Sequence, residues 1–206
     1  DTLRLYEMFL GPLEQFKPWD VKGINGVHNF LRKFWRLVHD DKNRFRVSNV
    51  NPTLENYKTL HKTIKKVEED IERFSFNTVV STLMICINEL TDQKCHNKEI
   101  ITDFTVLLSS YAPHISEEIW QKLGNESSVT QAIFPSFNPN YLLENEINYP
   151  ISFNGKTRFM MKLDAEMSRQ KIEDEVMNHE KTINYLDGKK PKNVIVVAGR
   201  IVNVVV

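Results

Sequence analysis

The 206-residue sequence is poor in the residue patterns that build catalytic and metal sites. It has only seven glycines and no glycine-rich phosphate-binding loop, and it lacks Gly-x-Ser-x-Gly, His-Glu-x-x-His and Cys-x-x-Cys motifs. Its two cysteines, Cys86 and Cys95, have no partner cysteine or histidine at zinc-ligand spacing, which indicates reduced thiols of a cytoplasmic protein. We therefore expect no catalytic residue, no metal ligand and no cofactor-binding residue in this chain.

Long apolar runs and an excess of one charge are also absent. No stretch of 18 apolar residues occurs, so no membrane-spanning helix is expected. The first residues, Asp1 to Glu7, contain no initiator methionine, basic region or cleavage site, and they read as the middle of a longer chain. The net charge is zero, although residues 147–206 hold ten basic and seven acidic residues. Only the C-terminal part therefore leans towards a polyanionic partner.

The first two thirds of the chain have the periodicity of amphipathic helices. Apolar residues recur every three or four positions, which is typical of helices that bury one face. One helix is expected to start at Asn51-Pro52, with Asn51 as the cap and Pro52 as the first helical residue. The other expected helices cover Gly23 to His39, Asn77 to Leu90, Asn97 to Tyr111 (ended by Pro113) and Ser116 to Leu123 (closed by Gly124). Residues 1–124 are thus predicted to form a helical bundle.

The composition changes after Gly124. Residues 125–146 contain no basic residue and are rich in Asn, Ser, Pro and Glu, which predicts a linker. Beyond it the apolar period becomes two, and Asn154-Gly155 predicts a tight hairpin turn. A helix from Ser168 to Leu186 and two strands, Val194 to Ala198 and Ile201 to Val206, follow. Residues 147–206 are therefore predicted to be a small α+β domain of ββαββ order, so that the fold is mainly α with a small α+β addition.

Two local details of this small domain remain open in the sequence. A strict two-residue turn would pair Ile151 with Arg158 and so mix apolar and basic residues on one face. Either a β-bulge shifts the register, or long basic side chains lie across apolar ones. Pro150 favours an edge position for the first strand, because proline has no N–H to donate. The helix is expected to bury His179 and Ile183 along with its other inner residues.

Basic residues gather in three places where an RNA could bind. Arg32 and Arg36 lie one helical turn apart with Lys33 beside them, a repulsive arrangement unless an anion compensates it. Lys156, Arg158 and Lys162 alternate along one strand and are expected to share a face. Lys189, Lys190 and Lys192 form a loop that we expect beside Arg200. Such groups suit phosphate contact. Ordinary surface arginines and lysines that protect a sheet edge are the alternatives.

Several motifs resemble bacterial leucyl-tRNA synthetases, which are class I aminoacyl-tRNA synthetases. Near the N-terminus these are Arg4-Leu5-Tyr6-Glu7-Met8-Phe9 and Phe30-Leu31-Arg32-Lys33-Phe34-Trp35-Arg36-Leu37. The next motif along the chain is Phe76-Asn77-Thr78. It is followed by Tyr111-Ala112-Pro113-His114-Ile115 with Glu118-Ile119-Trp120, a combination that isoleucyl and valyl enzymes share. The segments that single out the leucyl family are Phe153-Asn154-Gly155-Lys156, Tyr185-Leu186-Asp187-Gly188 and Lys192-Asn193-Val194-Ile195-Val196-Val197.

The resemblance implies an anticodon-binding helical domain followed by a C-terminal tRNA-binding domain. Members of the family join leucine to tRNA(Leu) through a leucyl-adenylate, using ATP and Mg²⁺ bound by an upstream catalytic domain whose nucleotide-binding motifs do not occur in this sequence. This chain is then expected to be non-catalytic, monomeric and cytoplasmic. By resemblance, Arg32, Lys33 and Arg36 would contact the tRNA body. Its outer corner would be contacted by Lys156, Arg158, Lys189, Lys190, Lys192 and Arg200.

A different class of function is compatible with the same residues. A helical bundle with a small α/β domain could be a protein-interaction module whose basic residues only keep it soluble. Binding of leucine tRNA distinguishes the two hypotheses.

Overall fold

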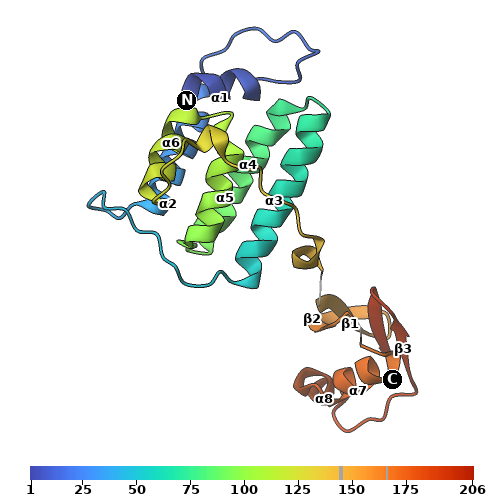
Figure 1. The fold of residues 1–206 in the computed structure, drawn as a ribbon. Helices are drawn as coiled ribbons and strands as arrows, with labels where there is room; N and C mark the ends of the chain where they lie inside the picture. The colour runs from blue at the N-terminus through green and yellow to red at the C-terminus, as the bar shows by residue number, and fades with distance from the viewer. Residues whose placement is uncertain (144–145, 166) are drawn as a thin grey trace. The chain divides into compact units, whose positions relative to one another are not determined.

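In the computed structural model, residues 1–143, 146–165 and 167–206 are described, and they form two compact units (Figure 1). The first unit is Asp1–Leu142 and the second is Leu143–Val206. The first unit is helical, whereas the second combines a sheet with helices. This agrees with the predicted fold class of a helical domain followed by a small α+β domain.

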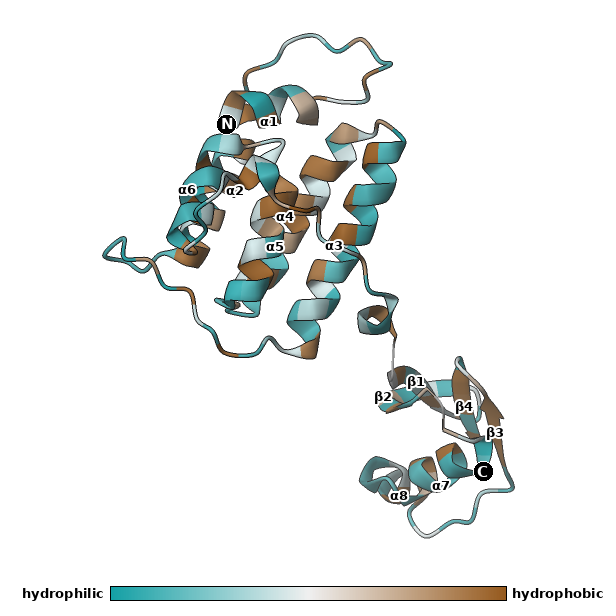
Figure 2. Ribbon diagram, in the orientation of Figure 1, coloured by the Kyte–Doolittle hydropathy of each residue, from teal (hydrophilic) through white to brown (hydrophobic). Residues whose placement is uncertain are grey.

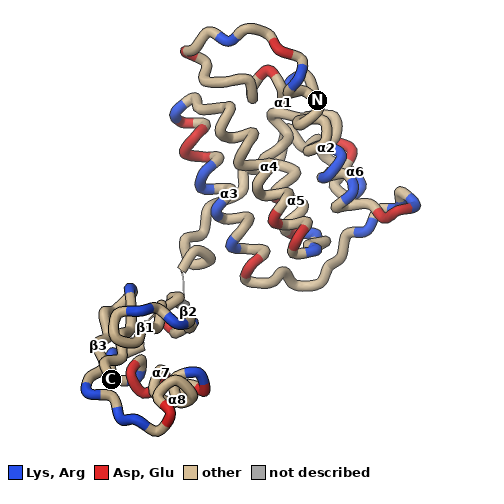
Figure 3. Tube along the Cα trace, turned by 180° about the vertical axis from the view of Figure 1, so that it is seen from behind, with Lys and Arg blue, Asp and Glu red and all other residues tan. Residues whose placement is uncertain are grey.

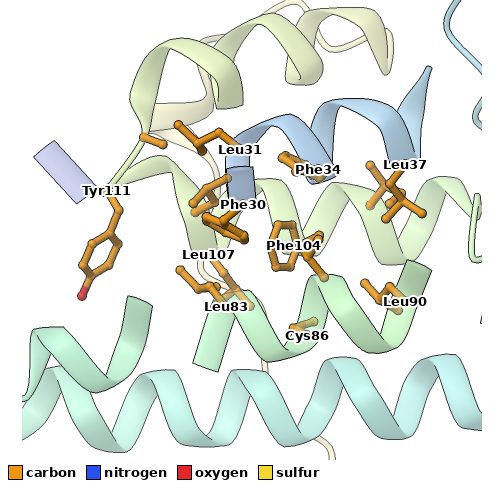
Figure 4. Close-up of a cluster of buried hydrophobic side chains, with 14 of the residues drawn as sticks. Phe30, Leu31, Phe34, Leu37, Leu83, Cys86, Leu90, Phe104, Leu107 and Tyr111 are labelled. Atoms are coloured by element: carbon orange, nitrogen blue, oxygen red, sulfur yellow. The ribbon is translucent and has the colours of Figure 1, made fainter. Parts of the chain in front are cut away.

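The first unit is a bundle of six α-helices with two short 3-10 helices. Apolar residues from all six α-helices form one core, in which the rings of Phe34 and Phe104 meet edge to face at 4.9 Å (Figure 4). Hydrophilic residues line the outer side of the long helix α3, as its amphipathic period predicts (Figure 2). The elements are α1 (Thr2–Phe9), α2 (Ile24–Val38), α3 (Leu54–Glu72), α4 (Phe76–Asp92), α5 (Lys98–Ser109), α6 (Pro113–Lys122), η1 (Val129–Gln131) and η2 (Pro139–Leu142).

Two helix starts differ from the sequence-based prediction. Helix α3 begins at Leu54 and is capped by Thr53, not by Asn51, because the Thr53 and Asn56 side chains each accept a hydrogen bond from the other's backbone N–H. Helix α6 begins at Pro113 rather than at Ser116. Its first turn is held by the Asp1 carboxylate, which accepts hydrogen bonds from the backbone N–H groups of His114 and Ile115. The predicted end at Gly124 is confirmed by its φ of +92°.

Residues 125–142, most of the predicted linker, pack against the bundle. The indole of Trp120 donates a hydrogen bond to the Ser127 carbonyl at 2.8 Å, and the Glu117 carboxylate accepts one from the Val129 N–H at 3.0 Å. Val129 is buried, and the Tyr141 ring stacks on α3. Polar composition predicted a linker here, but side-chain hydrogen bonds and a few large apolar residues are sufficient to hold an irregular segment in place.

The second unit is a four-stranded sheet with two helices that share its core. Its elements are β1 (Glu146–Phe153), β2 (Lys156–Asp164), α7 (Arg169–Asn178), α8 (Glu180–Leu186), β3 (Asn193–Val197) and β4 (Ile201–Val205). The strand order is β2-β1-β4-β3, with two antiparallel hairpins joined by a parallel pairing of β1 and β4. Ile172, Val176 and Leu186 of the helices are buried with β1 and β4 residues. The predicted ββαββ order is confirmed, with the helical part in two pieces.

The hairpin register contains the bulge that the sequence left open. Phe153 pairs with Lys156, but Ile151 pairs with Phe159, so Arg158 is the extra residue. The bulge keeps apolar residues opposite one another along the rest of the hairpin. The edge position expected for β1 was wrong, because β1 lies between β2 and β4. Pro150 is tolerated since the pairing with β4 covers only Ile151 to Phe153.

The predicted single helix from Ser168 to Leu186 is interrupted at His179. Its backbone is extended there (φ −70°, ψ 133°), and its imidazole caps α8 by accepting a hydrogen bond from the Lys181 N–H. After the break, α8 is rotated about its axis relative to a continuation of α7, so different side chains face the core. Thr182 is therefore buried while Ile183 is 57% exposed, contrary to the predicted inner stripe.

Candidate nucleic-acid interface

Helix α2 presents two arginines to solvent because its apolar residues occupy the opposite face. Arg32 and Arg36 are exposed one turn apart, whereas Phe34 and Leu37 are buried. Among residues 1–143, 146–165 and 167–206, no acidic side chain pairs with either arginine. Lys33 differs, since its ammonium donates a hydrogen bond to Asn88 of α4 at 2.7 Å. The structure therefore places two of the three predicted residues as exposed, uncompensated cations and gives the third an intramolecular partner.

A further arginine, which sequence reasoning missed, contacts the backbone of α2 at Arg36. The guanidinium of Arg46 donates a hydrogen bond to the backbone carbonyl of Arg36 at 3.2 Å. Arg46 is exposed and ten residues distant in sequence. Helical spacing could not reveal it, because the chain between them is an irregular loop.

In the second unit, five basic residues lie at one end of the sheet. The β1–β2 turn meets the end of β4 there: the Asn154 N–H donates to the Val204 carbonyl and the Gly155 N–H to the Asn203 side chain. Lys192 immediately precedes β3 at the same end, where its N–H donates to the Val205 carbonyl at 2.7 Å. The five, all exposed, are Lys156, Arg158, Lys189, Lys190 and Lys192, and we call them the basic end. Figure 3 marks the Lys and Arg positions along the chain in blue.

Aromatic contacts join helix α8 to the basic end. The Tyr185 ring lies against Phe153, the last residue of β1, with 4.2 Å between ring centroids. The Arg158 guanidinium lies 5.1 Å from the centre of the Tyr185 ring, a cation–π contact. Lys189 and Lys190 follow α8 in the connection that leads to Lys192. The sequence pattern therefore identified residues that the fold brings together from two segments.

Arg200 and Lys162 lie elsewhere, contrary to the sequence-based expectations. Arg200 occupies the β3–β4 turn, and its N–H donates to the Val197 carbonyl. This turn is at the opposite end of a five-residue strand from Lys192, about 16 Å away at the rise of a strand. Lys162 pairs with Asn148, whereas Lys156 pairs with the buried Phe153, so the two lysines face opposite sides of the sheet. The bulge at Arg158 is the physical reason for this change of face.

Metal-ligand groups and the buried thiol were compared with the cationic surfaces as candidate sites in the described residues. In the described ranges, no group of three or more His, Cys, Asp or Glu side chains could hold a metal ion. Burial raises the pKa of the Cys86 thiol to about 12, which keeps it from acting as a thiolate nucleophile. In the same part of the chain, no helix has the length and apolar character needed to cross a membrane. What the surface offers is exposed cationic side chains on two units.

Comparison with known proteins identifies the family. A family described as the anticodon-binding domain of tRNA ligase matches residues 56–174. The chain is 60% identical to the leucine–tRNA ligase of Christiangramia forsetii over 205 residues, which are 100% of this chain and 21% of that protein. It is 52% identical to the leucine–tRNA ligase of Bacteroides thetaiotaomicron over 206 residues, again 100% of this chain and 22% of the relative. The chain thus spans about a fifth of the length of these relatives.

A solved structure supports the same relationship. The crystal structure of the ternary complex of Agrobacterium radiobacter K84 agnB2 LeuRS with tRNA and LeuAMS is similar, with a TM-score of 0.66 and 25% identity. The likeness covers 99% of this chain and 28% of that chain. With the helical bundle, the small α+β unit and the matched residues all in agreement, the chain belongs to the family of anticodon-binding domains of tRNA ligases, and its whole sequence corresponds to a segment of leucine–tRNA ligases.

Proposed function

We propose that this chain is the tRNA-binding part of a leucine–tRNA ligase and that it positions tRNA(Leu) for aminoacylation elsewhere in the protein. The observation that carries the proposal is the match of the entire chain to leucine–tRNA ligases, of which it forms about a fifth. The remaining four fifths would contain the catalytic domain, which would bind ATP and Mg²⁺ and form the leucyl-adenylate. A similar solved protein was crystallised with tRNA, which supports the same role here.

The two cationic surfaces give this proposal a physical basis. Arg32 and Arg36 would bind phosphates of the tRNA body. Lys33 would also contact the tRNA body, while its ammonium donates a hydrogen bond to Asn88. The basic end would bind the outer corner of the tRNA. RNA at such a corner exposes phosphates, 2′-hydroxyls and unstacked bases, for which lysine, arginine and a neighbouring aromatic ring are suited. We propose a smaller part for Arg200, since it lies at the other end of the sheet.

A matched pair of double variants tests the assignment of the basic end. In one, Lys190 and Lys192 are changed to Ala; in the other, Lys162 and Arg200 are changed to Ala, so both lose two positive charges from the same unit. Labelled tRNA(Leu) is titrated with the 206-residue chain at low and moderate salt. We expect the first variant to bind about tenfold more weakly and its salt slope to fall by roughly 1 to 2, and the second to change little.

The same titration can contradict the proposed function itself. An unrelated RNA hairpin that binds as tightly as tRNA(Leu), with the same salt slope, would show that the chain has no role specific to tRNA. No binding of either RNA would favour the protein-interaction module instead. Equal losses of affinity in both double variants would show that the basic end is not the specific contact surface. The proposal that the chain binds tRNA would still stand.

A further inference from the structure

The loop that follows α2 has a defined fold that returns the chain to the helix. The Asp40 carboxylate accepts hydrogen bonds from the N–H groups of Lys42 and Arg44 and from the Arg44 guanidinium, at 2.7–2.9 Å. The Trp35 indole donates to Asn43 at 2.7 Å. Arg46 then donates its backbone N–H to the Val38 carbonyl at 2.9 Å. The loop between Val38 and Arg46 is thereby fixed on the last turn of α2.

This fold brings the Arg46 guanidinium to the backbone of α2 at Arg36, one helical turn from Arg32. Arg46 donates a side-chain hydrogen bond to the Arg36 carbonyl, and Arg36 lies one turn from Arg32. Two acids near His39, at the end of α2, are already engaged, because Asp40 pairs with Arg44 and Glu118 pairs with Lys122. Within the part of the chain that the structure describes, none of the three guanidiniums has a carboxylate partner. Like charges so arranged repel one another unless an anion lies between them.

We infer that Arg46 is a third phosphate-binding side chain of the bundle and that it acts together with Arg32 and Arg36 on the sugar–phosphate backbone of the bound tRNA. The inference rests on the proposed function. One N–H of Arg46 bonds to the Arg36 carbonyl and orients the guanidinium, which leaves its other donors available for a phosphate. Base stacking is not favoured at this surface, since the half-buried Trp35 ring is already stacked on His39 at 3.8 Å.

The test compares Arg46→Ala with two other variants in tRNA(Leu) binding by the 206-residue chain. Arg73→Ala is the matched control, because it removes the same charge from the exposed C-cap residue of α3, to which no tRNA contact is assigned. Arg46→Lys keeps the charge without the planar guanidinium. We expect Arg46→Ala to weaken binding about threefold to tenfold and to reduce the salt slope by about 1. Arg46→Lys should keep the slope, and Arg73→Ala should match the unmodified chain.

The outcomes separate this inference from the proposed function. If Arg46→Ala binds tRNA(Leu) as tightly as the unmodified chain, with an unchanged salt slope, Arg46 has no role in binding. The proposal that the chain binds tRNA is then unaffected. Weaker binding with an unchanged slope would also overturn it, because a lost phosphate contact must release fewer counterions. If the unmodified chain binds no tRNA(Leu), the proposed function and the role of Arg46 are both wrong.

Discussion

The Tyr141 ring lies parallel to the His61 imidazole, with 4.5 Å between centroids and 10° between planes. It also stacks on Tyr57 at 4.4 Å, and the His61 Nδ1 accepts a hydrogen bond from the Asn138 N–H at 3.3 Å. These contacts attach the end of the first unit to α3. The aromatic cluster therefore holds η2, which ends at Leu142, against α3.

Replacing Tyr141 by Ala is expected to release this attachment without unfolding the bundle. Loss of the two ring contacts removes about 1–2 kcal/mol of local stability. Hydrogen exchange of the backbone amides between residues 138 and 142 should then accelerate by about tenfold, whereas amides of α4 and α5 should be unchanged. Tyr141→Phe keeps the ring and should behave as the unmodified chain. Equal exchange rates in the Ala and Phe variants would contradict the attachment.

Asp103 is expected to destabilise the bundle at neutral pH. Burial, and then the nearby Glu99 carboxylate, raise its pKa to about 6. A carboxyl with a raised pKa contributes stability below its unfolded value and loses that contribution as pH rises through 6. Asp103→Asn should therefore raise the free energy of unfolding by about 1–2 kcal/mol at pH 7.5. Urea titrations at pH 7.5 and pH 4 check this, and the gain should vanish at the lower pH.

Two buried histidines should make the bundle less stable in mild acid. Burial lowers the pKa of His39 and of His61 below 6.5. The neutral imidazoles favour the folded state, so their contribution is present above pH 6.5 and is lost as pH falls through the lowered pKa values. In the Asp103→Asn background, we expect the free energy of unfolding to fall by about 1–2 kcal/mol between pH 7.5 and 5.5. A constant value over this range would contradict the prediction.

Deleting Arg158 should leave the second unit folded. The deletion removes the bulge but preserves the pairs of Phe153 with Lys156, Ser152 with Thr157 and Ile151 with Phe159. The expected loss is about 0.5–1 kcal/mol for the cation–π contact with Tyr185. Deleting Met160 instead would turn Met161 and Leu163 to the other face and unfold the unit. The amide chemical-shift dispersion of residues 147–206 distinguishes the two variants.

The sequence predicted those structural elements that are determined by apolar periodicity and by strong turn residues. The bundle helices, the Asn154-Gly155 turn and the ββαββ order all follow from local patterns. It did not predict the helix break at His179 or the start of α3 at Leu54 after the Thr53 cap. Each depends on a competition between neighbouring caps that differ by fractions of a kcal/mol, and periodicity does not resolve such a choice.

The cationic surfaces were predictable only where they follow one element. Arg32 and Arg36 are one turn apart, so their common exposure could be inferred. The separation of Arg200 from Lys192 also followed from the two predicted strands, because Arg200 lies in the turn between them and Lys192 precedes the first; the expectation that the two lie together did not apply that pattern. Arg46 was missed since no sequence rule joins it to Arg36. The basic end, assembled from β2 and the connection after α8, required the strand order.

The position of β4 constrains when the second unit can fold during protein synthesis. Strand β4 is the last of the four to emerge from the ribosome, yet it lies between β1 and β3 and contributes Val202 and Val204 to the core. Until its residues are available, β1 has no parallel partner and the two hairpins cannot join. The helical bundle can form while translation continues. The second unit must instead fold after its final strand has left the exit tunnel, so the nascent β1–β2 hairpin is exposed during that interval.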